Sequence, residues 1–220
     1  MTELLGLAAL GGALALDATS VGQFMVSRPL VAGALTGWLL GDPATGILVG
    51  ALLELYLLVA FPTGGARFPE GATATVVAVA AATAAPGPGA VPVAVAAGLL
   101  WGQVGGWSIT RHREAIARFV PEPSSRSVDA GRVAAAHVGA IGLDFVRGAL
   151  VTASGVVLAR LAVEATAEPW PLAPEASRGL LLVGGAVSAG ILLRSLGGVR
   201  KRGLLFLAGL VLGLAGATFL

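Results

Sequence analysis

The chain has 220 residues, of which 56% are hydrophobic and only 12% are charged, about half the charged fraction of an ordinary soluble domain. Charge this scarce cannot cover a water-facing surface, which excludes a soluble globular protein and leaves lipid as the solvent for most side chains. There is no cysteine, so disulfides and thiolate metal sites are excluded, and the basic residues lie in short loops between apolar runs, so no nucleic-acid partner is expected.

Short apolar stretches, interrupted by glycine and proline, make up the first half of the chain. A 12-residue helix spans about 18 Å at 1.5 Å per residue, whereas the hydrocarbon core of a bilayer is roughly 30 Å thick. Helices that stop at membrane depth are tolerated only inside protein or beside a water-filled cavity, and in transporters they build the substrate site. The stretches cover residues 4–16, 30–41, 45–61, 71–85 and 90–110.

Longer apolar runs alternate with charged segments in the second half. Basic residues gather at 111–132 and 194–202, and an acidic, proline-bearing loop lies at 164–176. Because positive charge marks the cytoplasmic side, we expect both basic segments in the cytoplasm and the acidic loop outside. The helices expected here cover residues 134–163, 177–194 and 203–220.

Together these elements predict an all-α, polytopic transmembrane protein with short broken or re-entrant helices in its N-terminal half. We expect a single membrane-embedded domain over residues 1–220. Within it, residues 1–110 would form the broken-helix half with the substrate site, 111–132 a cytoplasmic basic loop, and 133–220 a conventional helical half.

The first candidate site residues lie between the first two apolar stretches. Asp17, Gln23 and Arg28 place an acceptor, an amide and a cation in one short segment, and Pro29 suits the first turn of the next helix. The alternative is an interfacial loop with a cap and an arginine that reaches toward the headgroups. Further on, we interpret Gly41, Asp42 and Pro43 as structural: the end of one helix, and the cap and first residue of the next.

Glu54 is the most informative single residue of the sequence. It lies in an apolar run with no basic residue within one helical turn, and a carboxylate at membrane depth is costly and usually functional. It would accept hydrogen bonds from sugar hydroxyls or pair with Arg28 or Arg67. The alternative is a structural ion pair between helices.

Two more segments supply candidate binding residues. The proline- and glycine-rich stretch 61–71 would bring Thr63, Arg67 and Glu70 together with backbone carbonyls, or would be an ordinary solvent loop. Gln103 is a less certain contributor from the following apolar run. Asp144 and Arg147, three residues apart within the helix expected at 134–163, are interpreted as a structural intrahelical pair.

Several of these residues also carry a family resemblance. The relevant stretches are Arg28-Pro29-Leu30, Leu39 to Asp42 with Thr45-Gly46-Ile47, Leu53-Glu54, Pro69-Glu70 and Gly102-Gln103-Val104, with weaker matches at His137-Val138, Phe145 to Arg147, and Gly179 to Gly185. In this order they resemble the IIC subunit of the mannose/fructose/sorbose family of the bacterial sugar phosphotransferase system.

The resemblance implies a permease of the cytoplasmic membrane. Such a subunit pairs with a IID membrane subunit, binds and translocates a hexose, and passes it to cytoplasmic IIB, itself served by IIA. It would form an oligomer and would carry no catalytic residue, metal or cofactor. The two histidines, His112 and His137, lie far apart, so a metal site between them is not expected.

Three departures from the family pattern leave the sugar undetermined. Ser27 stands where the family often has His, Ala60-Phe61-Pro62 replaces a Trp-Met-Asn stretch, and Glu70 replaces Asp. Losing an amide from a sugar pocket shifts specificity strongly. A transport-deficient regulatory or scaffold component, and an unrelated small permease, therefore remain as alternative functions.

Overall fold

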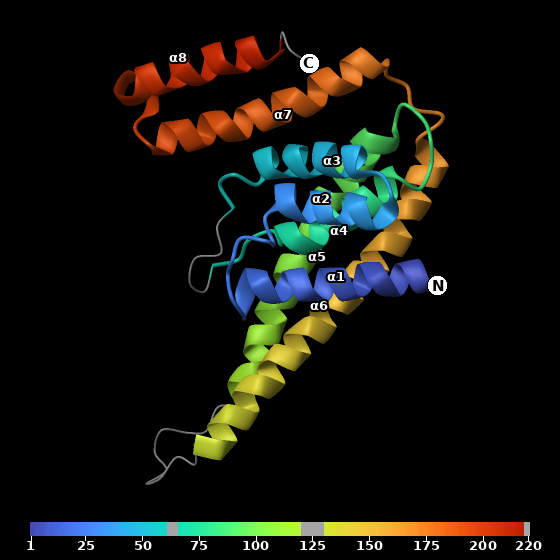
Figure 1. The fold of residues 1–220 in the computed structure, drawn as a ribbon, viewed down its shortest axis with the longest axis vertical. Helices are drawn as coiled ribbons and strands as arrows, with labels where there is room; N and C mark the ends of the chain where they lie inside the picture. Colours follow the sequence, from blue (N-terminus) through green and yellow to red (C-terminus); the bar gives the residue numbers. More distant parts are fainter. Residues whose placement is uncertain (61–65, 120–129, 218–220) are drawn as a thin grey trace.

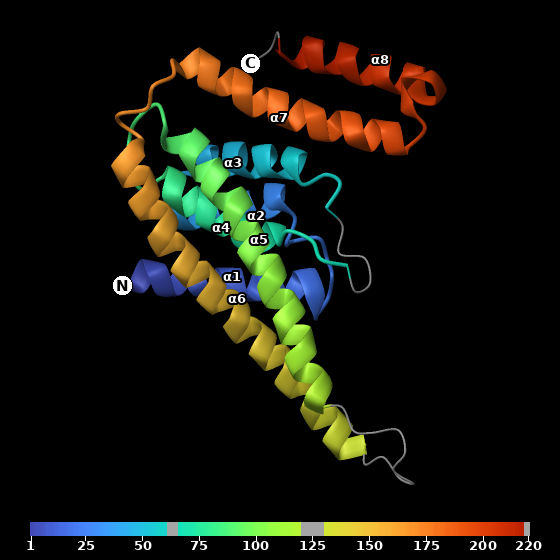
Figure 2. The same ribbon diagram turned by 180° about the vertical axis from the view of Figure 1, so that it is seen from behind.

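The computed structural model describes residues 1–60, 66–119 and 130–217, and every regular element in these ranges is a helix. The prediction of an all-α fold is confirmed. Figures 1 and 2 show the helices from opposite sides. Their bounds are α1 Thr2–Thr19, α2 Pro29–Leu40, α3 Pro43–Tyr56, α4 Gly71–Ala82, α5 Ala90–Ile116, the 3-10 turn η1 Ala117–Phe119, α6 Ala130–Thr166, α7 Pro174–Ser195 and α8 Gly198–Ala217.

Four helices of the described residues are long and apolar enough to cross a membrane, namely α1, α5 with η1, α6 and α7. The helices α2, α3 and α4 have only 12 to 14 residues. The predicted contrast between short helices in the first half and long helices in the second is therefore present, although α1 and α5 of the first half are long.

The segment 111–132 was expected as a polar loop, and this expectation is wrong at both ends. Helix α5 continues to Ile116 and α6 begins at Ala130, while residues 120–129 lie outside the described part of the chain. The sequence after Thr110 favours a helix because Arg111 pairs with Glu114 one turn later at 3.0 Å. The Arg111 guanidinium also lies over the Trp107 ring.

The last helix differs from its prediction as well. The sequence predicts a helix over residues 203–220, whereas α8 begins at Gly198 and is kinked at Arg202. It runs antiparallel beside α7 at one end of the molecule, as both views show (Figures 1 and 2).

The turn between α2 and α3 forms as the sequence predicts. Gly41 ends α2 with a φ of 78°, and Asp42 caps α3 by accepting a hydrogen bond from the Thr45 amide at 3.0 Å. The two helices then run together with almost no side chain between them, because a Cβ on Gly37 would lie 2.8 Å from the Gly46 Cα. Such glycine contacts allow close helix packing in a membrane.

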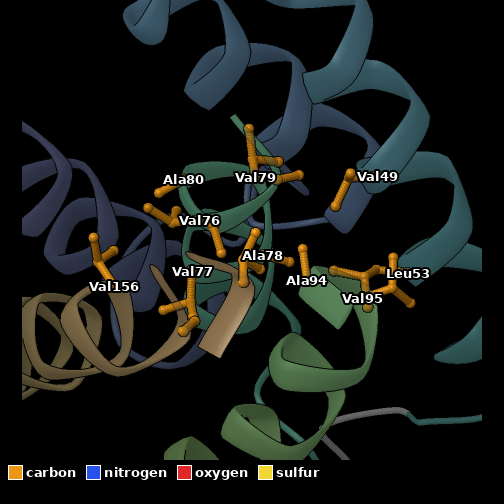
Figure 3. Close-up of a cluster of buried hydrophobic side chains, with 14 of the residues drawn as sticks. Val49, Leu53, Val76, Val77, Ala78, Val79, Ala80, Ala94, Val95 and Val156 are labelled. Carbon is orange, nitrogen blue, oxygen red and sulfur yellow. The ribbon is translucent and has the colours of Figure 1, made fainter. Parts of the chain in front are cut away.

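Helix α4 is the centre of the core. It packs against α1, α2, α3, α5 and α6, and all its residues except Gly71 are buried. Its side chains are Ala, Thr and Val only, which keeps five neighbouring helices close. Figure 3 shows Val76, Val77 and Val79 among the residues that meet them. The start of this buried helix, at Glu70, is where the polar residues of the molecule converge.

Candidate functional site

A polar cavity of about 270 Å³ lies where the end of α1, the start of α2 and the segment before α4 meet. Its first wall is the segment 17–29, which contributes Asp17, Gln23 and Arg28. Its second wall is the segment 68–72, which contributes Glu70, and Leu57 and Ala60 complete the lining. The volume lies near the lower limit for small-ligand sites.

The first wall is held in shape by Asp17. Its carboxylate accepts hydrogen bonds from the backbone amides of Phe24 at 2.7 Å and Ser27 at 2.8 Å. The loop that carries these two amides is strained, because Gln23 and Met25 have φ values of 53° and 64°, which residues with a side chain rarely adopt. Asp17 thus fixes a loop that would otherwise relax.

Arg28 joins this wall to α3. Its guanidinium forms an ion pair with the Glu54 carboxylate, which also accepts a hydrogen bond from the Leu30 amide at 3.3 Å. Of the two arginine partners that the sequence left open for Glu54, the structure shows Arg28. The Glu54 side chain is 20% exposed and that of Arg28 26%; Arg28 lines the cavity, and Glu54 lies behind it.

Glu70, in the second wall, is fully buried, and its carboxylate belongs to a cluster inside the protein. Arg147 donates to its two oxygens at 2.8 and 3.1 Å, and Thr73 donates to Oε2 at 2.8 Å. Glu70 comes this close to α5 because position 105 is glycine: a Cβ there would lie 2.8 Å from the Glu70 Cβ. These oxygens are engaged by protein donors, so Glu70 shapes the wall rather than offering a free acceptor.

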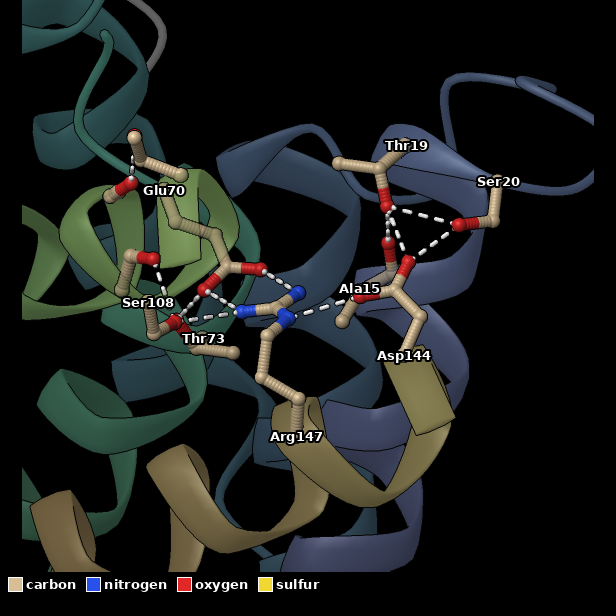
Figure 4. Close-up of polar contacts among 11 residues, drawn as sticks. Ala15, Thr19, Ser20, Glu70, Thr73, Ser108, Asp144 and Arg147 are labelled. Carbon is tan, nitrogen blue, oxygen red and sulfur yellow. Dashed lines mark hydrogen bonds and ion pairs between the residues drawn. The ribbon is translucent and has the colours of Figure 1, made fainter. Parts of the chain in front are cut away.

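The cluster extends from Arg147 to α1. Arg147 also donates to Asp144 at 2.7 Å and to Ser108 at 2.9 Å. Asp144 in turn accepts from Thr19 at 2.5 Å and from Ser20. Figure 4 shows the Arg147 guanidinium between the two carboxylates.

The predicted intrahelical pair of Asp144 and Arg147 is confirmed, but sequence reasoning missed its contact with Glu70. One signal was present. Two charged residues in a helix expected to span a membrane should have partners on other helices, and Glu70 is an acid directly before an apolar run.

Of the remaining predicted site residues, those that the structure describes do not line the cavity. Arg67 and Gln103 are exposed and lie outside its lining. Thr63 lies outside the described residues. Of the eight predicted positions, Asp17, Gln23, Arg28 and Glu70 line the cavity.

A second cavity, of about 340 Å³, lies between α3, α7 and the start of α5. It is larger, but its lining is mostly leucine, valine and proline, with Ser177 and Arg178 as its polar residues. A polar solute with many hydroxyls would leave most of its hydrogen bonds unmade there. The smaller polar cavity is therefore the better candidate for such a solute.

Comparison with known proteins gives a family match over nearly the whole chain. Residues 3–215 match the family model of the sorbose-specific IIC component of the phosphotransferase system. A stretch of 53 residues is 43% identical to the sorbose-specific EIIC component of Lacticaseibacillus casei, covering 24% of this chain and 19% of that protein. A stretch of 54 residues is 41% identical to the mannose-specific EIIC component of Escherichia coli (strain K12), covering 24% and 20%.

The matched stretches thus span about a fifth of the length of these two relatives. Two solved structures share the fold over the whole chain at 18% identity. One is described as a membrane protein, with a TM-score of 0.72 and 94% of its chain covered. The other is the mannose transporter ManYZ in complex with microcin E492, with a TM-score of 0.62 and 93% covered.

Proposed function

The chain belongs to the sorbose-specific IIC family of the sugar phosphotransferase system, and from this premise we propose that it binds a hexose in the polar cavity and passes it across the cytoplasmic membrane. The family is one of multi-pass membrane permease components, so translocation and not catalysis is the role assigned to this chain. The observation that carries the proposal is the convergence of Asp17, Gln23 and Arg28 on one cavity.

The chemistry of this wall suits a neutral polyol. A sugar hydroxyl loses its water on binding and needs both donors and acceptors in return. Gln23 supplies an amide, which both donates and accepts, and Arg28 supplies charged donors. The Asp17 carboxylate holds the loop that carries Gln23, and Glu54 holds Arg28. The apolar side chains of Leu57 and Ala60 suit the C–H faces of a ring.

The proposal includes partners. A IID membrane subunit would cover exposed apolar surface and complete the path, and cytoplasmic IIB and IIA would phosphorylate the emerging sugar. The likeness to a mannose transporter of two named components, ManYZ, supports a membrane partner. We also keep the division into a substrate-site half, 1–110, and a helical half, 133–220, as part of the proposal.

A second candidate is a scaffold component that no longer transports. Ala60 lines the cavity at the place where the family resemblance implies a tryptophan followed by Met and Asn. A cavity without that amide would bind sugar weakly. Absence of hexose binding by the co-purified complex with IID would favour this alternative over transport.

Glu54→Gln tests the site. The change keeps the shape but removes the charge that holds Arg28, so we expect hexose affinity to fall about 10-fold or more, in line with the roughly 1.5–3 kcal/mol of a charged hydrogen bond. Binding is measured by calorimetry on the IIC–IID complex in detergent. The matched control is Glu3→Gln, since Glu3 pairs with Arg160 of α6, outside the cavity lining.

Normal assembly with unchanged affinity in Glu54→Gln would show that the pair does not serve the ligand. Loss of assembly together with binding would instead make Glu54 a structural ion-pair partner.

Orientation in the membrane is tested separately. The natural chain has no cysteine, so Glu114→Cys and Glu168→Cys each give a single thiol. Both positions are exposed, one at the end of α5 and one after α6. We expect an impermeant maleimide to label Glu168→Cys from outside intact cells and Glu114→Cys only after lysis. Labelling of both from the same side would overturn the assignment of 111–132 to the cytoplasm and 164–176 to the exterior.

A further inference from the structure

One turn of α6 contacts both walls of the polar cavity from behind. Asp144 accepts hydrogen bonds from Thr19 and Ser20, which end α1 just beyond Asp17 and lead into the first wall. Arg147 donates two hydrogen bonds to Glu70, which belongs to the second wall and precedes α4. Neither Asp144 nor Arg147 lines the cavity.

We propose that the Asp144–Arg147 turn of α6 sets the distance between the two walls, so that Arg147 is a positioning residue for a ligand it does not touch. The affinity part of this inference depends on the proposed function. The geometric part does not, because it concerns the spacing of two protein segments in the absence of ligand.

The geometry of the cluster makes this link stiff. The guanidinium is planar, and its three nitrogens donate in fixed directions to Asp144, Glu70 and Ser108. The side chains of Glu70, Asp144 and Arg147 are 0%, 1% and 9% exposed, so water does not compete for these bonds. Paired charges in such a setting are held in one arrangement, because any other leaves a buried charge without partners.

Besides the packing of α1 against α6, the polar link from the first wall to this cluster consists of two hydroxyl groups. Thr19 and Ser20 donate to the same Asp144 oxygen, and both ion pairs of Arg147 are made without them. Removing the hydroxyls therefore removes the polar link to one wall while leaving both ion pairs of Arg147 in place. Loss of Arg147 itself would break those ion pairs as well.

The test measures the width of the cavity directly. Spin labels are attached to cysteines at two exposed positions, Val21 in the first wall and Arg67 directly before the second wall. The distance distribution is recorded by pulsed electron paramagnetic resonance in nanodiscs without sugar. We expect the combined variant Thr19→Val with Ser20→Ala to broaden this distribution at least twofold. We expect the same of Arg147→Lys, because an ammonium cannot reproduce the fork of bonds.

Two controls remove the same chemical groups away from the cluster, and a third keeps both hydroxyls in it. Thr83→Val removes a hydroxyl that bonds only to the backbone of α4. Arg160→Gln removes an arginine of the same helix α6 that pairs with Glu3. Thr19→Ser with Ser20→Thr keeps both hydroxyls and should restore the narrow distribution. A distribution that stays narrow in both the hydroxyl-free variant and Arg147→Lys, with the proteins folded, would overturn the inference.

Hexose affinity of the IIC–IID complex is the second readout. We expect about a 10-fold loss in the hydroxyl-free variant and less than a twofold change in Thr83→Val and Arg160→Gln. If the natural chain binds no hexose, the proposed function fails while the distance measurement still decides the positioning role. If affinity is unchanged although the walls have separated, the turn sets the geometry but not the affinity, and the functional half of the inference is wrong.

Discussion

Glu70→Ala is expected to lower the free energy of unfolding by about 3–5 kcal/mol, the usual cost of breaking a buried ion pair from one side. Arg147 is 9% exposed and loses both Glu70 oxygens as partners. Its remaining partners are Asp144 and Ser108. The guanidinium N–H groups that bonded to Glu70 would then be buried without an acceptor. The measurement is chemical unfolding in mixed detergent micelles, followed by tryptophan fluorescence.

The control is Glu3→Gln, which removes the charged partner of Arg160, another arginine of α6. The Glu3 side chain is 52% exposed, so its pair with Arg160 contributes no more than about 1 kcal/mol. Equal losses of unfolding free energy in the two variants would mean that water reaches the cluster around Arg147. The link between the two walls would then be neither dry nor stiff.

Asp17→Ala is expected to reduce hexose affinity about 100-fold while leaving the helices intact. The carboxylate makes two charge-assisted hydrogen bonds to the loop, each worth roughly 1.5–3 kcal/mol. These bonds oppose the strain at Gln23 and Met25, which have positive φ at a cost of roughly 1–2 kcal/mol each. Without these bonds the strained loop relaxes into other conformations. Hexose affinity then falls in proportion to the fraction of molecules whose loop still has the binding conformation.

Asp42→Ala provides the control for this prediction. Asp42 also accepts a backbone amide hydrogen bond, from Thr45 in the α2–α3 turn, but it lies outside the cavity lining. We expect the hexose affinity of Asp42→Ala to stay within about threefold of that of the natural chain. Unchanged affinity in Asp17→Ala, with the protein folded, would remove the loop from the binding site.

The sequence predicts local structure well where a single residue type determines it. Gly41, Asp42 and Pro43 mark a helix end, a cap and a helix start because each has a distinct backbone requirement, and all three lie as expected. Helix α5 continues past 110 and α6 begins before 134, although an arginine-rich segment between apolar runs predicts a loop. Arginine is also a good helix former, and its charge says nothing about backbone conformation.

The candidate site is predictable only in part, for a different physical reason. Asp17, Gln23 and Arg28 lie within 12 residues and reach one cavity because a short loop cannot separate them. Gln103 shares a helix with Gly102 and Gly105, which face the second wall, yet it points outward and is exposed. Which face of a helix meets its neighbours is set by packing across the whole bundle, and an apolar sequence with small residues all round gives little indication of it.

The separation of Glu70 and Arg147 along the chain has a consequence for biogenesis. The two residues are 77 positions apart, so during synthesis the carboxylate leaves the ribosome well before its cation exists. At about 5–20 residues per second, the interval is roughly 4–15 s. Throughout it, α4 carries at its start an acid that costs several kcal/mol to place in hydrocarbon. The start of α4 is therefore expected to stay at the membrane surface or within the insertion machinery until α6 supplies Arg147.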